Sequence, residues 1–303
     1  MFDFLRTVII NNSAMKNTLF LCFFLIVSAG YRQYSTTKTE YNKTDEIEGI
    51  NKYVEDNSTF IRSIKPIIME VDIYEYTNKG RRAENQDSFG YKKLDYVIIG
   101  CIADGVGGVS GGKIASQYSV DNYLEKVTDI NDNLNTVIED IHRSIVKLQR
   151  KKVQYDRMAT TFTGCVVSKN KIKGVHLGDS KLFILRRDSI RQFTSSHTEV
   201  GRLLRTGKLT KEEAKSYPRK NFIESAIGMK DTITIQTFEF ELEQYDRILL
   251  TTDGVHNVVS NIEFRDLSKK NKNINGFGDD LVTLLKDKPT SDNFTFLIIE
   301  ITN

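Results

Sequence analysis

The sequence of 303 residues contains no Trp, only three Cys and only three Pro, and its charges nearly cancel. Three scattered Cys residues are too few for a disulfide framework. A net charge of +3 provides no electrostatic footprint for general nucleic-acid binding. Gly and Pro are also too rare for a low-complexity or collagen-like chain. The chain should therefore fold, and its function must be sought in local sites.

The one long apolar run lies near the N-terminus. Residues 19–27 are apolar without interruption, Lys16 precedes them and small residues follow. Counted from Met15, an alternative start, this pattern has the parts of a secretory signal. Residues 15–31 also reach the lower length limit of a membrane anchor, and a buried or unstructured leader is a third interpretation. The length favours an anchor with the rest of the chain in the cytosol, while soluble cytosolic and secreted forms stay open.

A change of composition divides the rest of the chain. Residues 35–57 are rich in Thr, Asn, Lys and Glu and have no sustained apolar periodicity, which indicates a linker that we expect to extend over residues 35–66. We therefore expect a leader over residues 1–34, this linker, and one folded domain over residues 67–303.

Short β-rich runs dominate the folded part, and short connections between many of them favour antiparallel hairpins. The runs cover residues 67–76, 96–103, 162–168, 172–176, 182–186, 190–193, 233–242, 247–251 and 294–301. Helical periodicity is clear over 134–148, with Asn131 or Asn133 as the N-cap, and weaker over 114–127 and 277–286. Because helices and strands occur in blocks, we expect an α+β fold of antiparallel sheets covered by helices.

Four Asp residues stand at the ends of apolar runs, each followed by a turn former: Asp104, Asp179, Asp253 and Asp292. A single such Asp is most often a plain turn residue. Carboxylates that converge at one sheet edge repel one another unless a cation neutralises them. Oxygen ligands without Cys or His at zinc-site spacing favour Mg²⁺ or Mn²⁺. A pair of such cations can activate a water and clamp a phosphoryl group.

A glycine-rich stretch, DGVGGVSGG, begins at Asp104. Its glycines permit close backbone approaches, but a flexible turn is the alternative interpretation. The stretch matches neither the P-loop nor the dinucleotide-binding pattern, which disfavours a nucleotide-binding fold.

These residues resemble a known family, the metal-dependent protein phosphatases of the 2C type, in their compact bacterial-like form. The family fold is a β-sandwich of two antiparallel sheets flanked by helices, in agreement with the block pattern above. The matching blocks stand in family order over residues 70–301: GRRAENQDSFG (80–90), CIADGVGGVSGGKIAS (101–116), ATTFTGCVV (159–167), VHLGDSKLFILRR (175–187), IRQFTSSHTEVGRLLRTGKLTKEEA (190–214), RILLTTDGVHNVVS (247–260) and SDNFTFLIIEI (291–301).

The resemblance implies two metal ions, Mg²⁺ or Mn²⁺, with room for a third. Asp104 would bridge the two ions, and the carbonyl of Gly105 would complete one coordination sphere. Asp253 and Asp292 would bind the second ion. Asp179, together with Asp253, would hold the third and weaker ion.

Two further residues take roles from the resemblance. Asp87 would support the waters bound to the metal ions. Arg82 would grip the substrate phosphate, a role that suits the donor fork and permanent charge of a guanidinium. Arg81 is the neighbour that could be confused with Arg82, but the spacing R-x-x-N-x-D selects Arg82.

The chain also departs from the family pattern. Gln86 stands where Glu is frequent, Val106 stands where eukaryotic members have His, and Asn257 replaces a frequent Asp, which weakens the expectation of a third ion. Cys101 and Cys165 are expected in the core. His256 is expected at the rim rather than among the metal ligands.

The resemblance implies a serine/threonine protein phosphatase that cleaves phosphoserine and phosphothreonine by attack of a metal-bridged water, with no covalent enzyme intermediate. Its partners would be phosphoproteins rather than nucleic acid, and a monomer is expected. A phosphoprotein-binding regulatory module with weak or no catalysis and an enzyme for small phosphate esters are the alternatives. Residues 198–226 correspond to the family's flap; their basic charge would guide an anionic substrate or be an ordinary solvated surface.

Overall fold

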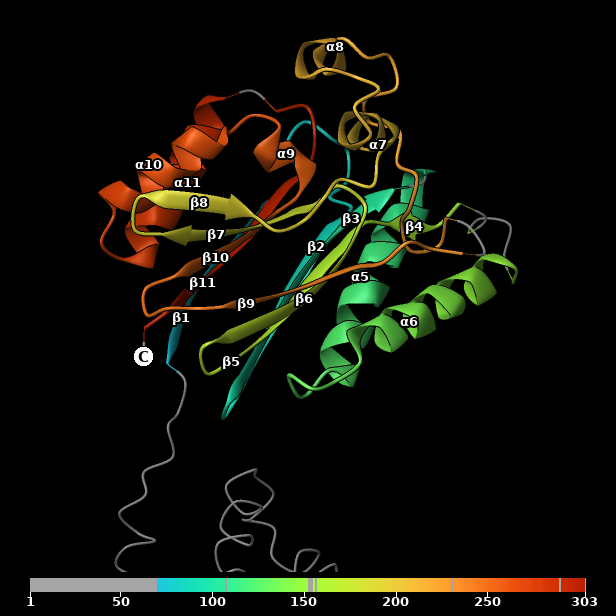
Figure 1. Cartoon of the computed structure of the whole chain (residues 1–303). Coiled ribbons are helices and arrows are strands. Elements are labelled where there is room, and N and C mark those ends of the chain that lie inside the picture. The colour runs from blue at the N-terminus through green and yellow to red at the C-terminus, as the bar shows by residue number, and fades with distance from the viewer. Residues whose placement is uncertain are drawn as a thin grey trace, which may run out of the picture. The chain divides into compact units, whose positions relative to one another are not determined.

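Two antiparallel sheets lie face to face at the centre of the fold, with helices on both outer sides (Figure 1). The computed structural model describes residues 70–106, 108–151, 155, 157–229, 232–288 and 290–302.

The first sheet has the strand order β1-β11-β10-β7-β8, and all its neighbours are antiparallel. Strand β11 is buried along its whole length, because other strands flank it and both its faces are covered. The strands are β1 (Val71–Asn78), β7 (Lys181–Arg186), β8 (Ser189–Gln192), β10 (Arg247–Thr251) and β11 (Phe294–Ile301).

The second sheet has the order β2-β3-β5-β6-β9, and a short strand, β4, pairs with the far end of β3. These pairs are also antiparallel. The strands are β2 (Asp87–Leu94), β3 (Val97–Val106), β4 (Ala159–Thr160), β5 (Phe162–Ser168), β6 (Lys171–Leu177) and β9 (Gln236–Glu241).

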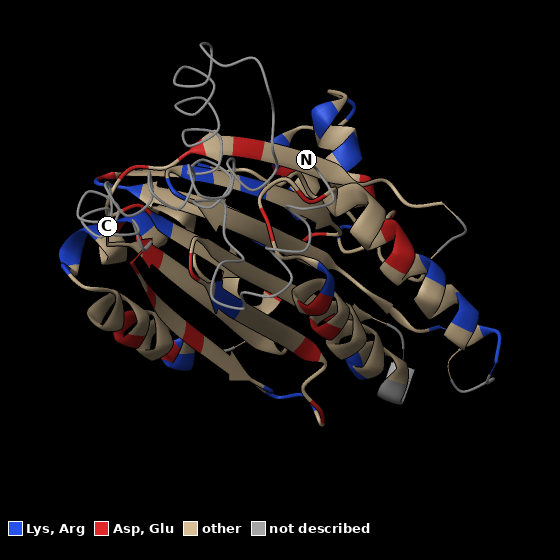
Figure 2. Ribbon diagram, turned by 90° about the horizontal axis from the view of Figure 1, so that it is seen from below, with Lys and Arg blue, Asp and Glu red and all other residues tan. Residues whose placement is uncertain are grey.

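Helices α5 and α6 cover the outer face of the second sheet, and α10 and α11 cover that of the first (Figure 1). Charged residues are spread along these helices (Figure 2). The helices are α5 (Gly108–Lys126), α6 (Leu134–Gln149), α7 (Glu199–Arg205), α8 (Lys211–Lys215), α9 (Asp253–His256), α10 (Asn261–Lys270) and α11 (Ile274–Asp287).

The alternation of side chains along each strand separates three apolar layers. In β3, Ile98 and Ile102 point between the sheets, where they join Leu297 and Ile299 of β11. Their neighbours in β3, including Ile99, face α5 and α6 instead. A third layer lies between the first sheet and helices α9 to α11. The α+β fold expected from the block pattern and the sandwich implied by the family resemblance are thereby confirmed.

Several expected elements match the structure closely. The runs 162–168, 247–251 and 294–301 are strands with those bounds. Helix α6 begins after Asn133, whose side chain accepts a hydrogen bond from the backbone N–H of Thr136. Asn133 rather than Asn131 is therefore the N-cap. Cys101 and Cys165 are buried in the core, as expected.

Other elements differ from the expectation. Strand β2 was not foreseen, because as an edge strand with Gly90 and consecutive lysines it lacks a clean apolar alternation. The helix expected over residues 114–127 starts earlier, because α5 begins at Gly108, within the glycine-rich stretch. Helix α10 was also missed, although Ser260 and Glu263 form a capping box at its start.

Among the residues that the structure describes, no helix is long and apolar enough to cross a membrane. The apolar run 15–31 and the boundaries of the leader and linker lie outside those residues. The predictions about them stay predictions.

Candidate active site

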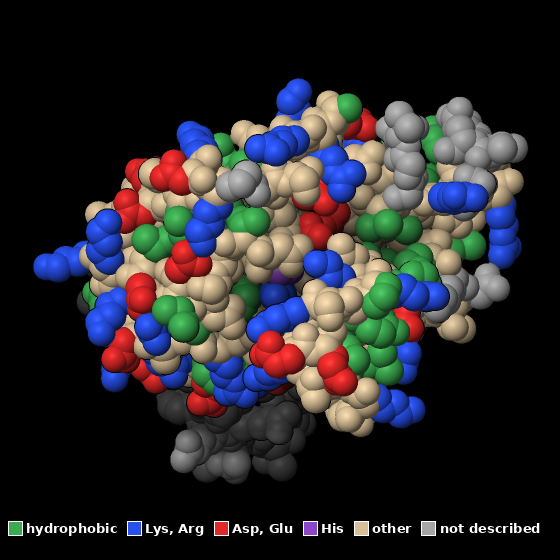
Figure 3. Space-filling view, turned by 90° about the horizontal axis from the view of Figure 1, so that it is seen from above, with side chains coloured by type: hydrophobic (Ala, Val, Ile, Leu, Met, Phe, Trp, Pro, Cys, Tyr) green, Lys and Arg blue, Asp and Glu red, His purple; other side chains and the backbone are tan. Residues whose placement is uncertain are grey.

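The predicted carboxylates gather at one end of the two sheets. Asp87 at the start of β2 lies directly opposite Asp104 of β3 in the strand register. Asp253 opens α9 immediately after β10, and Asp179 follows the end of β6. Asp292 lies just before the start of β11, whereas Asp179 and Asp253 follow the ends of their strands. In Figure 3 acidic side chains lie in a central hollow with Lys and Arg side chains around it.

Asp104 is the centre of this group. Burial raises the pKa of Asp104 well above its usual range, and repulsion by Asp87, Asp253, Asp179 and Asp292 raises it further. Like charges placed opposite each other on paired strands are destabilising. The proximity of these carboxylates thus disfavours their simultaneous ionisation.

The backbone at Asp104 is held firmly. Its N–H donates to Oγ1 of Thr161, at 2.9 Å, and its carbonyl accepts from Oγ1 of Thr160, also at 2.9 Å. The Thr161 hydroxyl is in turn 2.7 Å from the hydroxyl of Ser180, next to Asp179. These bonds tie the Asp104 strand to the Asp179 loop.

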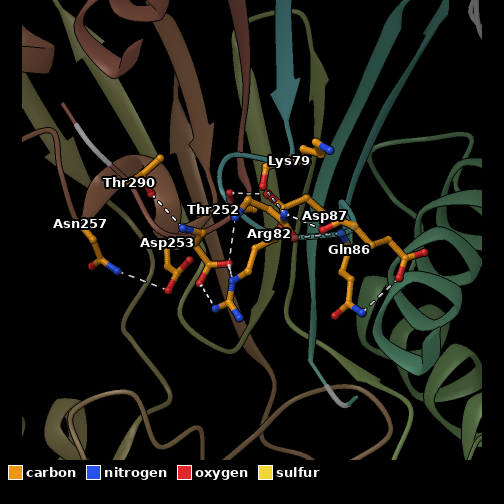
Figure 4. Close-up of polar contacts among 11 residues, drawn as sticks. Lys79, Arg82, Gln86, Asp87, Thr252, Asp253, Asn257 and Thr290 are labelled. Atoms are coloured by element: carbon orange, nitrogen blue, oxygen red, sulfur yellow. Dashed lines mark hydrogen bonds and ion pairs between the residues drawn. The ribbon is translucent and has the colours of Figure 1, made fainter. Parts of the chain in front are cut away.

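Asp87 is almost fully buried, with 2% of its surface exposed. Its Oδ2 accepts hydrogen bonds from the hydroxyls of Thr252, at 2.8 Å, and Thr295, at 2.7 Å (Figure 4). Its Oδ1 is buried and finds no donor in the described part of the chain. Burial, together with repulsion by Asp292, raises the pKa of Asp87 to about 6 despite these two bonds.

Asp253, like Asp87, has one carboxylate oxygen with a hydrogen-bond donor and one without. Nδ2 of Asn257 donates to its Oδ2 at 3.3 Å (Figure 4), but among the described residues no donor reaches its buried Oδ1. Burial and then repulsion by Asp179 raise the pKa of Asp253 to about 7. The pKa of Asp179 rises to about 6, mainly through burial.

Lys181 and His256 lie beside the carboxylates, and burial lowers the pKa of each. Burial lowers the pKa of Lys181, while Asp179 and Asp253 act in the opposite direction. His256, expected at the rim, has its Nδ1 3.0 Å from the hydroxyl of Thr251 at the end of β10. Burial lowers the pKa of His256 well below its usual range.

Gly105 brings α5 against the start of β2. Its N–H donates to the carbonyl of Gln86 at 3.2 Å, and a Cβ at Gly105 would lie 2.3 Å from the carbonyl oxygen of Gly112. Ser116 of α5 donates to the same Gln86 carbonyl at 2.6 Å. The glycines therefore permit β3, the start of β2 and α5 to pack closely, as the sequence suggested. Gly112 does so from within the helix α5 rather than from a loop.

Arg82 makes a two-pronged ion pair with Asp292. Its Nε is 2.9 Å from Oδ1 and its Nη2 is 2.8 Å from Oδ2 (Figure 4). The Arg82 side chain is 58% exposed and the Asp292 side chain 34%. The expected phosphate-binding group thus rests on an expected metal ligand. Among the described residues, no three His, Cys, Asp or Glu side chains are grouped so as to hold a metal ion as they stand.

The sequence reasoning missed several residues that support this group. Thr252 and Thr295, which hold Asp87, and Asn293, which follows Asp292, belong to quoted blocks, yet none was singled out. Their role depends on contacts between distant segments. The sequence signal that could have identified two of them is their position, since Thr252 and Asn293 are polar residues next to the predicted ligands Asp253 and Asp292.

Comparisons with known proteins show the family of the chain. The protein phosphatase 2C family profile matches residues 77–291. The serine/threonine phosphatase stp of Listeria welshimeri is 30% identical over 235 residues, which cover 74% of this chain and 93% of that protein. The solved serine/threonine phosphatase of S. agalactiae has a TM-score of 0.71 and 29% identity, covering 77% of this chain and all (100%) of that one.

A more distant solved structure is the PstP catalytic domain in complex with 2 manganese ions. Its identity is 23% and its TM-score 0.67, over 77% of this chain and 99% of that one, which shows a shared fold. The extent of the profile match and the stp similarity carry the assignment. The chain therefore belongs to the protein phosphatase 2C family of serine/threonine protein phosphatases.

Proposed function

We propose that this phosphatase hydrolyses phosphoserine and phosphothreonine in proteins with the help of divalent cations held by its carboxylate group. The observation that carries the proposal is the convergence of Asp87, Asp179, Asp253 and Asp292 on Asp104, whose pKa burial and the repulsion of these carboxylates raise well above its usual range.

The donor set fits hard divalent cations. Oδ1 of Asp87 and Oδ1 of Asp253 are buried and lack donors in the described part of the chain. Carboxylate and carbonyl oxygens are the ligands that Mg²⁺ and Mn²⁺ prefer. The manganese complex of the PstP domain supports the same class of ion.

We assign the ligand roles as the family pattern suggests. Asp104 and the carbonyl of Gly105 would hold one ion, and Asp104 would share a second ion with Asp253 and Asp292. Asp179 lies beside Asp253 and would hold a third, weaker ion. Asn257 brings an amide rather than a charge to this place, so we expect low occupancy of that third position.

The remaining groups act on the substrate and its surroundings. When bound, the divalent ions supply an activated water and neutralise charge on the phosphoryl oxygens. Asp87, held by two threonine hydroxyls, would keep its free Oδ1 aimed into the ion site. Arg82 would leave Asp292 and bind two phosphate oxygens through its donor fork, which orients the ester.

Replacement of Asp253 by Asn tests the proposal. With Mn²⁺, the wild type should cleave an aryl phosphate and a phosphothreonine peptide, and a chelator should stop both reactions. Asp253→Asn should lower kcat/KM at least about 100-fold, because a ligand charge is lost. Asp188→Asn, which changes an exposed carboxylate whose side chain is 74% exposed, is the matched control.

Activity that survives both the chelator and Asp253→Asn would contradict the metal mechanism. A wild type that binds the phosphopeptide without cleaving it would favour the regulatory-module alternative.

A further inference from the structure

Asn293 uses both polar atoms of its side chain on one segment, residues 79–86. Its Oδ1 accepts a hydrogen bond from the backbone N–H of Gln86 at 2.9 Å. Its Nδ2 donates to the carbonyls of Lys79 and Glu84, each at 2.9 Å. Asn293 is only 6% exposed, so these bonds are shielded from water.

The segment that Asn293 holds carries Arg82. The backbone N–H of Arg82 donates to the carbonyl of Lys79 at 3.2 Å, the same carbonyl that Asn293 binds (Figure 4). Gly80 has a φ of +56°, and a Cβ there would lie 2.2 Å from the carbonyl oxygen of Asp292. The turn before Arg82 therefore packs directly against the backbone of Asp292 and the side chain of Asn293.

Two adjacent residues thus hold Arg82 in different ways. Asp292 pairs with its guanidinium, and Asn293 fixes the backbone from which the side chain extends. The N–H of Asn293 also donates to Oδ1 of Asp292 at 2.9 Å. An ion pair at an exposed side chain is easily exchanged for another anion, whereas the three bonds of a buried amide are not.

We propose that Asn293 is a positioning residue for substrate phosphate: it fixes the turn 79–86 so that Arg82 meets the phosphate in one orientation. This inference rests on the proposed function. Because Asn293 already holds the turn 79–86 in place, Arg82 loses little conformational freedom when it binds phosphate. If the turn were loosened, ordering it on binding would lower the affinity for phosphate.

Asn293→Asp and Asn293→Ala test the inference in the full chain with Mn²⁺ and an aryl phosphate. Asn293→Asp keeps the shape but removes both donors and sets a carboxylate against two carbonyls. Asn293→Asp loses the two donated hydrogen bonds and Asn293→Ala loses all three. KM should rise about three- to tenfold in each variant, because the turn is loosened rather than lost, while kcat changes less than about twofold. The Ki of inorganic phosphate should rise by the same factor.

Gln149→Ala is the matched control. The Gln149 amide likewise donates to two loop carbonyls, those of Met158, at 2.6 Å, and Gly228, at 2.7 Å. Its loss should lower thermal stability to a similar degree and leave KM unchanged. An equal rise in KM for Gln149→Ala would show a general effect of instability and would overturn the inference.

A double-mutant cycle tests whether Asn293 affects KM through Arg82. In an Arg82→Ala background, Asn293→Asp should leave KM within about twofold, because the group that it positions is gone. A full three- to tenfold rise in that background would overturn the inference. A loss of Mn²⁺ affinity in the Asn293 variants, measured by calorimetry, would also overturn the inference, because Asn293 would then act through Asp292.

Hydrogen exchange separates this inference from the proposed function. Amides of residues 79–86 should exchange faster in Asn293→Ala and unchanged in Gln149→Ala, whether or not the protein turns over an ester. Unchanged exchange in Asn293→Ala would overturn the positioning role. A wild type without any phosphatase activity would contradict the proposed function instead.

Discussion

Arg82 is the residue at which two expected roles meet. Its guanidinium lies on Asp292, an expected metal ligand, although its expected partner is phosphate. Both partners present two oxygens to the same donor fork, so either can occupy it. Because the pair is largely exposed, it contributes little to stability and can be given up when a cation takes Asp292.

Arg82→Ala should therefore affect substrate binding most. We expect KM for an aryl phosphate to rise about tenfold or more, with a smaller change in kcat, because a charged pair of hydrogen bonds to the phosphate is lost. Steady-state kinetics with Mn²⁺ measure this split. Arg81→Ala, its exposed neighbour, is the control, and an unchanged KM in Arg82→Ala would refute the assigned role.

At the scale of elements, the junction of β3 and α5 shapes the site. Here the backbone of Gly105 approaches the first turns of α5 so closely that a Cβ at Gly112 would lie 2.8 Å from the Gly105 carbonyl carbon. A Cβ at the adjacent Gly111 would meet Met158 at 3.4 Å, an ordinary contact. Gly112 therefore has no room for a side chain, whereas its neighbour Gly111 has room for a methyl group.

This difference predicts opposite effects of the same substitution. Gly112→Ala should destabilise the fold by about 1–3 kcal/mol, because the strand and the helix must move apart. Gly111→Ala should be neutral or stabilise it by up to about 1 kcal/mol, because Ala favours a helix. Urea denaturation measures both. Equal losses would mean that the close contact with Gly105 does not limit this junction.

At the scale of the whole molecule, the gathered carboxylates make stability depend on pH and on cations. The folded pKa values of Asp87, Asp179 and Asp253, about 6, 6 and 7, lie above the ordinary value of 3.8. Such groups favour the fold while protonated, and this stability is lost as the pH rises through the folded pKa values. His176, whose pKa burial lowers to about 3, opposes this trend only up to about pH 6.5, where the unfolded His loses its proton.

The loss from these three carboxylates runs from their ordinary pKa of 3.8 up to about pH 7. Because His176 and His256, whose pKa values burial lowers, oppose it up to about pH 6.5, we expect a net fall in the stability of the cation-free protein between about pH 6.5 and pH 7.5, while Asp253 still loses its proton. Each carboxylate that titrates only in the folded state costs up to about 1.4 kcal/mol per pH unit. For a domain of this size, each kcal/mol corresponds to a fall in Tm of about 2–4 °C. Thermal unfolding in chelator at several pH values measures the trend, and Mn²⁺ should remove it. A Tm that rises over this range without cations would contradict the arrangement of charges.

Much of the fold could be predicted because its signals are local. The strands at 162–168, 247–251 and 294–301 are continuous apolar runs, and α6 combines clear periodicity with Asn133 as its cap. Strand β2 was missed because an edge strand is stabilised by its partner more than by its own pattern. The start of α5 was missed because glycines read locally as a turn, whereas packing against β3 and β4 holds them in a helix.

The sequence by itself determined the order of the motifs and, through them, the family and the identity of the acidic residues. Only the tertiary structure decided how those residues meet: that Asp87 faces Asp104 across two strands, that Arg82 rests on Asp292, and that Asn293 holds the Arg82 turn. For Arg82 and Asp292, 210 positions apart, and for Asn293 and Lys79, 214 positions apart, the physical reason is distance along the chain, because such contacts leave no periodic trace in the sequence. Asp87 and Asp104 are close in sequence, but they face each other only through the register of β2, an edge strand that its own pattern does not predict.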